Sequence, residues 1–197
     1  MVLRKTIFFI MMACFAATVC AKDFSDIKSF KVNAKEKTVV NKREKKKEYL
    51  LTVKFPDKVL KEMKSPEVNR GELYAYNGNK KTIYIPLLNQ KSEKSIDEDE
   101  NYIIKIMKEI RAVDMGKAKN GVVENANGVY KVDMEKGVVT EALCDENRIV
   151  FSNFENINGI NFPKKVEVYE KKSLVSAVEF SDVKINENIP DTLFQIK

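Results

Sequence analysis

The sequence predicts an α+β fold made mostly of antiparallel β-strands, an unclosed half-barrel of about ten strands that wraps one main amphipathic helix. Most of the chain consists of short segments in which apolar and polar residues alternate between turn residues, which is typical of antiparallel sheets. One segment instead repeats its apolar residues at helical spacing. A single helix is too small to cover the apolar face of such a sheet. We therefore expect the sheet to curve around the helix with space left over.

Residues 1–21 have the three regions of a cleavable secretory signal. Arg4 and Lys5 give a short positive start, and the uncharged apolar stretch 7–17 follows it. Small residues at 19–21 then stand where a signal peptidase cuts. The apolar stretch is shorter than the roughly 20 residues that a membrane-spanning helix needs, so cleavage is favoured over an anchored helix. We therefore predict that the protein is exported.

Cys20 offers an alternative, because a lipid can be attached to a cysteine that becomes the new N-terminus. Residues 17–19 fit a lipidation signal poorly, since that signal begins with a large aliphatic residue and ends with Gly, Ala or Ser. Lipidation of Cys20 is therefore the less favoured alternative. Cleavage after Ala21 removes both Cys14 and Cys20. Cys144 is then the one cysteine of the mature chain, which rules out an intramolecular disulfide.

The remaining 176 residues, 22–197, are predicted to form a single domain with an apolar core. The chain has 35 basic and 29 acidic residues, and the loss of Arg4 and Lys5 leaves 33 basic ones. This mild, interspersed charge favours solubility, or weak affinity for anionic lipid headgroups, over nucleic-acid binding in an exported protein. The sequence has no histidine and no tryptophan, which excludes the common catalytic triads and most zinc sites. We expect no enzyme activity, no metal and no cofactor, and we expect Cys144 to pack inside the strand 138–144.

The N-terminal part of the mature chain is predicted to be a set of strands. Alternation places them at 27–32, 37–40 and 49–55. Pro56 ends the last of these strands, and 57–63 is predicted as about one helical turn. The basic run 41–48 contains two interleaved glutamates, which favours a solvated hairpin tip over a contact with acidic lipid or an acidic partner.

A hairpin is predicted where the strands 72–76 and 82–86 flank Asn77-Gly78-Asn79. An odd loop of three or five residues would place Leu73 and Ala75 on the same face as Ile83 and Ile85. The tyrosines of these strands would then share the other face; they are Tyr74, Tyr76 and Tyr84.

The C-terminal part is predicted to be a second set of strands. Alternation and turn chemistry place them at 128–134, 138–144, 148–154, 161–169, 174–180 and 183–185. Turn residues at 136–137, 158–159 and 170–173 separate several of these strands.

One segment breaks this pattern and predicts the main helix. Ser95 as N-cap and Glu98 three residues later fit a capping box. Apolar residues then recur at helical spacing, at Ile103, Ile106, Met107, Ile110 and Val113. The acidic run 97–101 is better explained by the start of this helix than by calcium binding. A calcium loop would need glycine where Tyr102 stands and glutamate where Lys108 stands.

Three segments carry a family likeness in their order and spacing. The first is the strand end and turn at 53–58, and the second is the hairpin with the segment leaving it at 69–86. The third runs from 162–169 through a hairpin to an ending with Asn186, a short linker and Phe194. Together they resemble the LolA/LolB superfamily of periplasmic lipoprotein-handling proteins.

This resemblance implies an unclosed antiparallel barrel capped by helices, with an apolar hollow that accepts the acyl chains of lipoproteins. It implies a monomeric periplasmic carrier, with acylated lipoproteins or lipid as partners, an inner-membrane donor complex and an outer-membrane acceptor. A location as an outer-membrane lipoprotein is the less favoured alternative. The residues expected to line the hollow are Leu51, Val53, Phe55, Leu73, Ile83, Ile85, Ile103, Met107 and Ile110.

The sequence departs from this family at one informative position. In the carrier branch the strand ends Lys-Arg-Pro, and that arginine is implicated in latching the helical lid; Phe55 stands at the matching position here. Two other classes stay open. An envelope interaction or sensor module would use the outer sheet face and the three hairpin tyrosines to bind a protein. An enzyme that uses paired carboxylates is the least favoured class.

Overall fold

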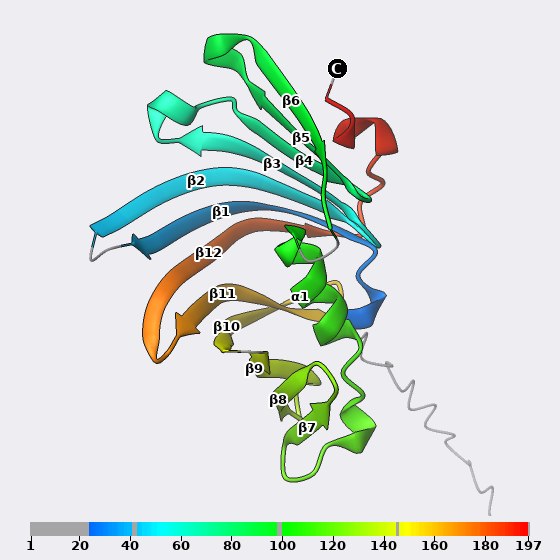
Figure 1. The fold of residues 1–197 in the computed structure, drawn as a ribbon. Coiled ribbons are helices and arrows are strands. Elements are labelled where there is room, and N and C mark those ends of the chain that lie inside the picture. The colour runs from blue at the N-terminus through cyan, green and yellow to red at the C-terminus, as the bar shows by residue number, and fades with distance from the viewer. Residues whose placement is uncertain (1–23, 41–42, 98–99, 145, 197) are drawn as a thin grey trace, which may run out of the picture.

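The strands of this protein form one antiparallel sheet (Figure 1). The computed structural model describes residues 24–40, 43–97, 100–144 and 146–196, so the predicted signal lies outside the described residues. The strands are β1 (Ser29–Val40), β2 (Arg43–Lys54), β3 (Lys58–Ser65), β4 (Leu73–Asn77), β5 (Lys80–Ile85), β6 (Gln90–Ser95), β7 (Val122–Asn125), β8 (Gly128–Asp133), β9 (Val138–Cys144), β10 (Asn147–Ile157), β11 (Ile160–Glu170) and β12 (Ser173–Ile185). Their order in the sheet is β6-β5-β4-β3-β2-β1-β12-β11-β10-β9-β8-β7.

The sheet curves around a helix and does not close. In Figure 1 it runs from β6 at the top of the view to β7 at the bottom, and these two edge strands do not pair with each other. The helix α1 (Tyr102–Arg111) lies on the concave side and is the α-helix of the described part of the chain. Short 3₁₀ turns complete the elements: η1 (Phe24–Asp26), η2 (Glu67–Asn69), η3 (Pro86–Leu88), η5 (Met115–Lys117) and η6 (Asp191–Phe194). The predicted fold class is confirmed, with twelve strands in place of about ten.

The prediction for 57–63 is wrong, because this segment begins the strand β3 and not a helical turn. Val59, Leu60 and Met63 are all buried, at 0%, 8% and 4% exposure. Val59 and Met63 belong to the core on the concave side, whereas Leu60 packs on the opposite face. A strand that is apolar on both faces loses the alternation by which a half-buried strand is recognised.

Other differences concern the ends and the number of strands. The predicted strands 27–32 and 37–40 are one strand, β1, and 174–180 and 183–185 are one strand, β12. The edge strand β6 was not predicted because all six of its residues are exposed, so its sequence carries no apolar alternation. Most of the basic run 41–48 belongs to β2, where 43–46 are exposed as expected; residues 41–42 lie outside the described chain.

The predicted face assignment of the β4–β5 hairpin is wrong. Asn77 pairs with Lys80, so the loop has two residues, and Tyr74 stands opposite Ile83. Directly opposed residues share a face of the sheet. Tyr74 therefore shares the face of Ile83, while Leu73 shares the other face with Tyr84. Changing the loop from an odd to an even length shifts the register by one residue and exchanges the two faces.

The helix α1 begins later than its predicted capping box. Asn101 is the N-cap, whereas Ser95 is the last residue of β6, and Glu98 lies outside the described residues. Four of the five predicted periodic residues nevertheless belong to the helix, which includes the buried Ile110, whereas Val113 is buried just beyond its end. Ile104 is also buried, at 2% exposure, and packs into the core of the concave face.

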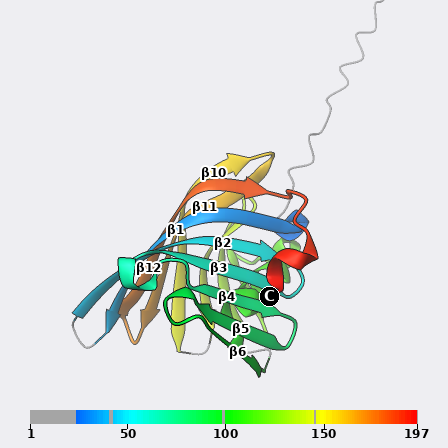
Figure 2. The same cartoon turned by 90° about the horizontal axis from the view of Figure 1, so that it is seen from above.

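The C-terminal segment covers the convex face of the sheet. Phe194 is 2% exposed and forms a small apolar cluster with Ile189, Leu60 and Ala75. Figure 2 shows η6 over the outer side of the strands near β3 and β4, which it contacts. The phenylalanine at the end of the resembling segment is therefore buried, as expected.

Candidate functional site

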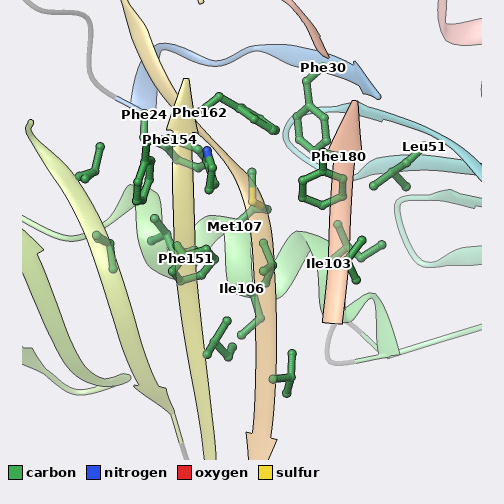
Figure 3. Close-up of a pocket in the computed structure, with 18 of the residues that line it drawn as sticks. Phe24, Phe30, Leu51, Ile103, Ile106, Met107, Phe151, Phe154, Phe162 and Phe180 are labelled. Carbon is green, nitrogen blue, oxygen red and sulfur yellow. The ribbon is translucent and has the colours of Figure 1, made fainter. Parts of the chain in front are cut away.

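A cavity of about 420 Å³ lies between α1 and the concave face of the sheet (Figure 3). It sits where two clusters of buried residues meet, one centred on β1, β2 and β3 and the other on β8, β9 and β10. Its lining is mainly apolar: Phe24, Phe30, Tyr49, Leu51, Ile103, Ile106, Met107, Ile110, Met115, Val138, Val139, Ile149, Phe151, Phe154, Phe162, Pro163, Val166, Val168, Val178 and Phe180. The remaining lining residues are Glu36, Lys61, Asn161 and Ser176.

Strand geometry brings these side chains to one face. Alternate residues of a strand point to the same side, and cross-strand partners share that side. Phe30 and Glu36 therefore point inward from β1, and Val178, the partner of Glu36, points inward from β12. The register continues to β11, where Val166 pairs with Val178.

The helix supplies the opposite wall. Ile103, Ile106, Met107 and Ile110 line the cavity from α1, and these positions recur three or four residues apart on one helix face. In Figure 3 the labelled members of this set face the phenylalanines of the sheet across the hollow. The apolar residues that recur at helical spacing in the sequence therefore form the wall of the cavity opposite the sheet, which we call its roof.

Four phenylalanines form the rim of the cavity near η1. The Phe162 ring lies 5.5 Å from Phe30, 6.1 Å from Phe180 and 6.4 Å from Phe24, measured between ring centroids. Aromatic rings at such distances attract one another and hold their relative orientation. This end of the cavity is therefore built from mutually packed rings that come from β1, β11, β12 and η1.

The other feature of the lining is a pair of opposite charges. Lys61 Nζ lies 3.2 Å from Glu36 Oε2 and 3.6 Å from the centroid of the Tyr49 ring. Burial lowers the pKa of Lys61, although the neighbouring carboxylate opposes this shift. Burial also raises the pKa of Tyr49, and the nearby Glu36 carboxylate adds to that effect. The phenol is therefore neutral, and the ion pair stands in a mainly apolar wall.

Of the nine residues expected to line a lipid cavity, the structure brings four together. Leu51, Ile103, Met107 and Ile110 lie in the lining. Val53 has 0% exposure and belongs to the core of the concave face. Ile83 and Ile85 are on β5, outside the lining.

The other two expected residues have different surroundings. Leu73 points to the convex face, where it packs against the cluster that includes Phe194. Phe55 follows the end of β2 and lines a second, more open hollow of about 690 Å³. Basic side chains surround that hollow; they are Lys28, Lys54, Lys108 and Arg111.

Phe55 nevertheless takes part in fixing the helix to the sheet. The Arg111 guanidinium, at the end of α1, lies 4.3 Å from the centroid of the Phe55 ring. Arg111 Nη1 donates a hydrogen bond to the Ile27 carbonyl oxygen at 2.9 Å, and Nη2 donates to the Ser25 carbonyl oxygen at 2.7 Å. In this chain the helix and the end of β2 are therefore joined by an arginine on the helix and a phenylalanine at the strand end.

Sequence reasoning missed the half of the lining that comes from β10, β11 and β12. Phe151, Val166, Val178 and Phe180 lie in strands that the alternation had located. The period-two pattern could have separated the two faces of each strand, but it does not say which face is concave. That choice depends on which side the helix covers.

The fold resembles that of known bacterial proteins. A DUF1329 family protein from Desulfovibrio piger superposes with a TM-score of 0.63 at 10% identity, covering 87% of this chain and 91% of that one. A LolA superfamily protein from Nitrosomonas europaea gives 0.55 at 17% identity, with coverages of 87% and 91%. A Vibrio parahaemolyticus domain assigned to outer membrane lipoprotein sorting gives 0.58 at 10% identity, with 85% and 89%.

These likenesses define the class of fold. The chain has a LolA-like fold, and the resemblance found in the sequence is confirmed at this level. No protein-family model and no curated protein matches the sequence. Within the described residues, no helix has both the length and the apolar character needed to cross a membrane.

Proposed function

We propose that this protein is a periplasmic carrier that binds the acyl chains of lipoproteins, or a lipid, in the cavity under α1. In this proposal it receives its cargo from an inner-membrane donor and delivers it toward the outer membrane. The observation that carries the proposal is the apolar cavity of about 420 Å³ between the helix and the sheet. Ligand pockets in proteins range from about 300 to 1,000 Å³ and are lined mostly by apolar side chains.

An acyl chain bound in such a cavity is shielded from water, which lowers its free energy. Each buried methylene contributes about 0.8 kcal/mol, so a chain of about 14 methylenes gains on the order of 10 kcal/mol before the cost of ordering it.

Phe30 and Glu36 both line the cavity and are six positions apart on β1. At about 3.3 Å per residue this is roughly 20 Å. One leaflet of a bilayer core is about 15 Å thick, so this stretch of the cavity wall on β1 is long enough to lie along an acyl chain.

The structural neighbours agree with this proposal, since one is assigned to outer membrane lipoprotein sorting and another belongs to the LolA superfamily. The alternative, an interaction module that binds protein through three tyrosines, finds less support. Tyr74 and Tyr76 pack against the core of the concave face, whereas Tyr84 shares the other face. The three tyrosines therefore do not form one outer surface.

The test begins with protein purified from its own envelope. Native mass spectrometry and organic extraction should detect co-purifying lipid or acylated protein. Repeated absence of both, with no binding of an acylated peptide to the purified protein, would refute the proposal.

A pair of variants locates the binding site. Met107→Asp places a charge in the roof of the cavity and should weaken acyl binding at least about tenfold, because a carboxylate opposes insertion of an apolar chain. Met134→Asp makes the same change at a side chain that is 55% exposed, and binding should be unchanged. Circular dichroism must show both variants folded. Equal affinities of the two folded variants would show that acyl chains bind elsewhere.

A further inference from the structure

The charged side chains in the described lining of the cavity are one acid and one base, and they contact each other. Glu36 comes from β1 and Lys61 from β3, on either side of β2. Their side chains are 17% and 21% exposed, and the Nζ–Oε2 distance is 3.2 Å. The ion pair is therefore mostly shielded from solvent and adds no net charge to the wall.

The pair stands at a fixed place relative to the apolar part of the cavity. Glu36 is six residues along β1 from Phe30, which belongs to the aromatic rim. Lys61 is held against the Tyr49 ring, 3.6 Å from its centroid. A chain whose apolar tail lies among the phenylalanines thus places its head near the ion pair.

The chemistry of this pair discriminates between kinds of head. A carboxylate head would gain the attraction of Lys61, but the negative charge of Glu36, 3.2 Å from the same ammonium, would offset part of that attraction, and the carboxylate would lose its hydration. An uncharged ester or amide loses much less hydration. Its carbonyl oxygen can accept from the ammonium group, which has three N–H donors of which one is directed at Glu36.

We propose that Glu36 and Lys61 make the cavity selective for acyl lipids with an uncharged ester or amide head and exclude free fatty acids. This inference rests on the proposed function, and it names the class of ligand that the same cavity takes. Glu36 and Lys61 are the residues that determine this specificity.

The test compares two probes with the same chain, dodecanoic acid and N-methyldodecanamide, at pH 8 where the acid is ionised. Each displaces a neutral apolar fluorophore, N-phenyl-1-naphthylamine, from the protein. The wild-type protein should bind the amide at least about tenfold more tightly than the acid. Glu36→Gln leaves the charge of Lys61 uncompensated, so the affinity for the acid should rise about tenfold or more, while that for the amide changes less than about threefold.

Two further variants serve as controls. Glu48→Gln makes the same change at a carboxylate of β2 that pairs with Lys35 and is 51% exposed. It lies outside the cavity lining, so the preference for the amide over the acid should not change. The double variant Glu36→Lys with Lys61→Glu reverses the pair while keeping it neutral, and the preference for the amide should remain. Loss of the preference in the folded double variant would overturn the inference even if Glu36→Gln does not fold.

The outcomes separate this inference from the proposed function. Binding of both probes with equal affinity, or a folded Glu36→Gln variant whose preference stays within twofold of wild type, would overturn the selectivity alone. Binding of neither probe, with no uptake of the fluorophore, would overturn the proposed function and the selectivity with it.

Discussion

The attachment of α1 to the sheet depends on Arg111, and its contribution can be measured. Arg111→Met keeps the apolar stem and removes the guanidinium with its two hydrogen bonds, at 2.9 and 2.7 Å, and its contact with Phe55. A hydrogen bond from a charged group contributes about 1.5 to 3 kcal/mol and a cation–π contact about 0.5 to 1. The Arg111 side chain is half-buried, so we take the lower ends for the hydrogen bond to Ile27 and the ring contact, about 2 kcal/mol, and at most about 1 kcal/mol for the exposed hydrogen bond to Ser25. We expect a loss of about 2 to 3 kcal/mol in the free energy of unfolding.

Two measurements check this value. Denaturant unfolding should give the free-energy loss directly, and the melting temperature should fall by roughly 4 to 10 °C for a chain of this size. Hydrogen exchange should show faster exchange of the α1 amides by about thirtyfold or more, because 1.4 kcal/mol corresponds to a factor of ten. Arg111→Lys should lose about half as much, since one ammonium cannot reproduce the planar fork of donors.

Arg70→Met is the matched control. Arg70 is 64% exposed and pairs with Glu67 three residues earlier, so its loss should change stability by less than about 0.5 kcal/mol. If Arg111→Met behaves like this control and the α1 amides keep their exchange rates, the helix is held by its apolar face alone and the reasoning is refuted.

Three further predictions concern the frame around the cavity. Lys54 and Lys58 hold the pKa of Asp191 below its usual range in the folded protein. Its ion pairs therefore stabilise the fold fully at pH values above the pKa of Asp191 in the unfolded chain, and this stabilisation is lost as the pH falls through the pKa of Asp191 in the folded protein. Asp191→Asn should therefore lower the melting temperature at pH 7, and its difference from wild type should begin to shrink as the pH falls below about 4 and vanish once the pH is below the folded pKa. Phe194→Ala empties the cluster on the convex face and should cost about 3 kcal/mol in denaturant unfolding, whereas an effect below 1 kcal/mol would mean that the C-terminal segment does not stabilise the sheet. Gly128→Ala would press a methyl group against a backbone carbonyl of β9 and should cost about 2 kcal/mol or more, and a neutral melting curve would contradict this close approach.

The elements that sequence reasoning located are those with one apolar and one polar face. The alternation of 49–55 and 148–154 and the helical spacing from Ile103 to Val113 each correspond to an element of the structure. The pattern was uninformative where both faces are buried, as in β3, and where both are exposed, as in β6. In both cases the tertiary neighbours, and not the local sequence, decide the conformation.

The cavity was harder to predict than the fold because it depends on faces and not on elements. Leu73 was placed on the inner face by an assumed odd loop, and the two-residue loop after Asn77 reverses that assignment. The inward residues of β12, such as Phe180, needed the knowledge of which side α1 covers. Lys61 was missed because the strand β3 itself was not predicted, although its charge at an inward position is the most specific feature of the lining.

The two unpaired edges of the sheet give the cavity a property that a closed barrel lacks. In a closed barrel the number of strands and their stagger fix the diameter. Here β6 and β7 are at opposite ends of the described sheet, so its radius is not fixed by closure. Neighbouring strands in proteins are rotated by about −10 to −35° relative to one another, so a few degrees at each of the eleven junctions of the described sheet would change its radius. In the carrier proposed above, bending of this open sheet would let the cavity take ligands of different bulk, with α1 following the ends of β1 and β2 near which Arg111 holds it.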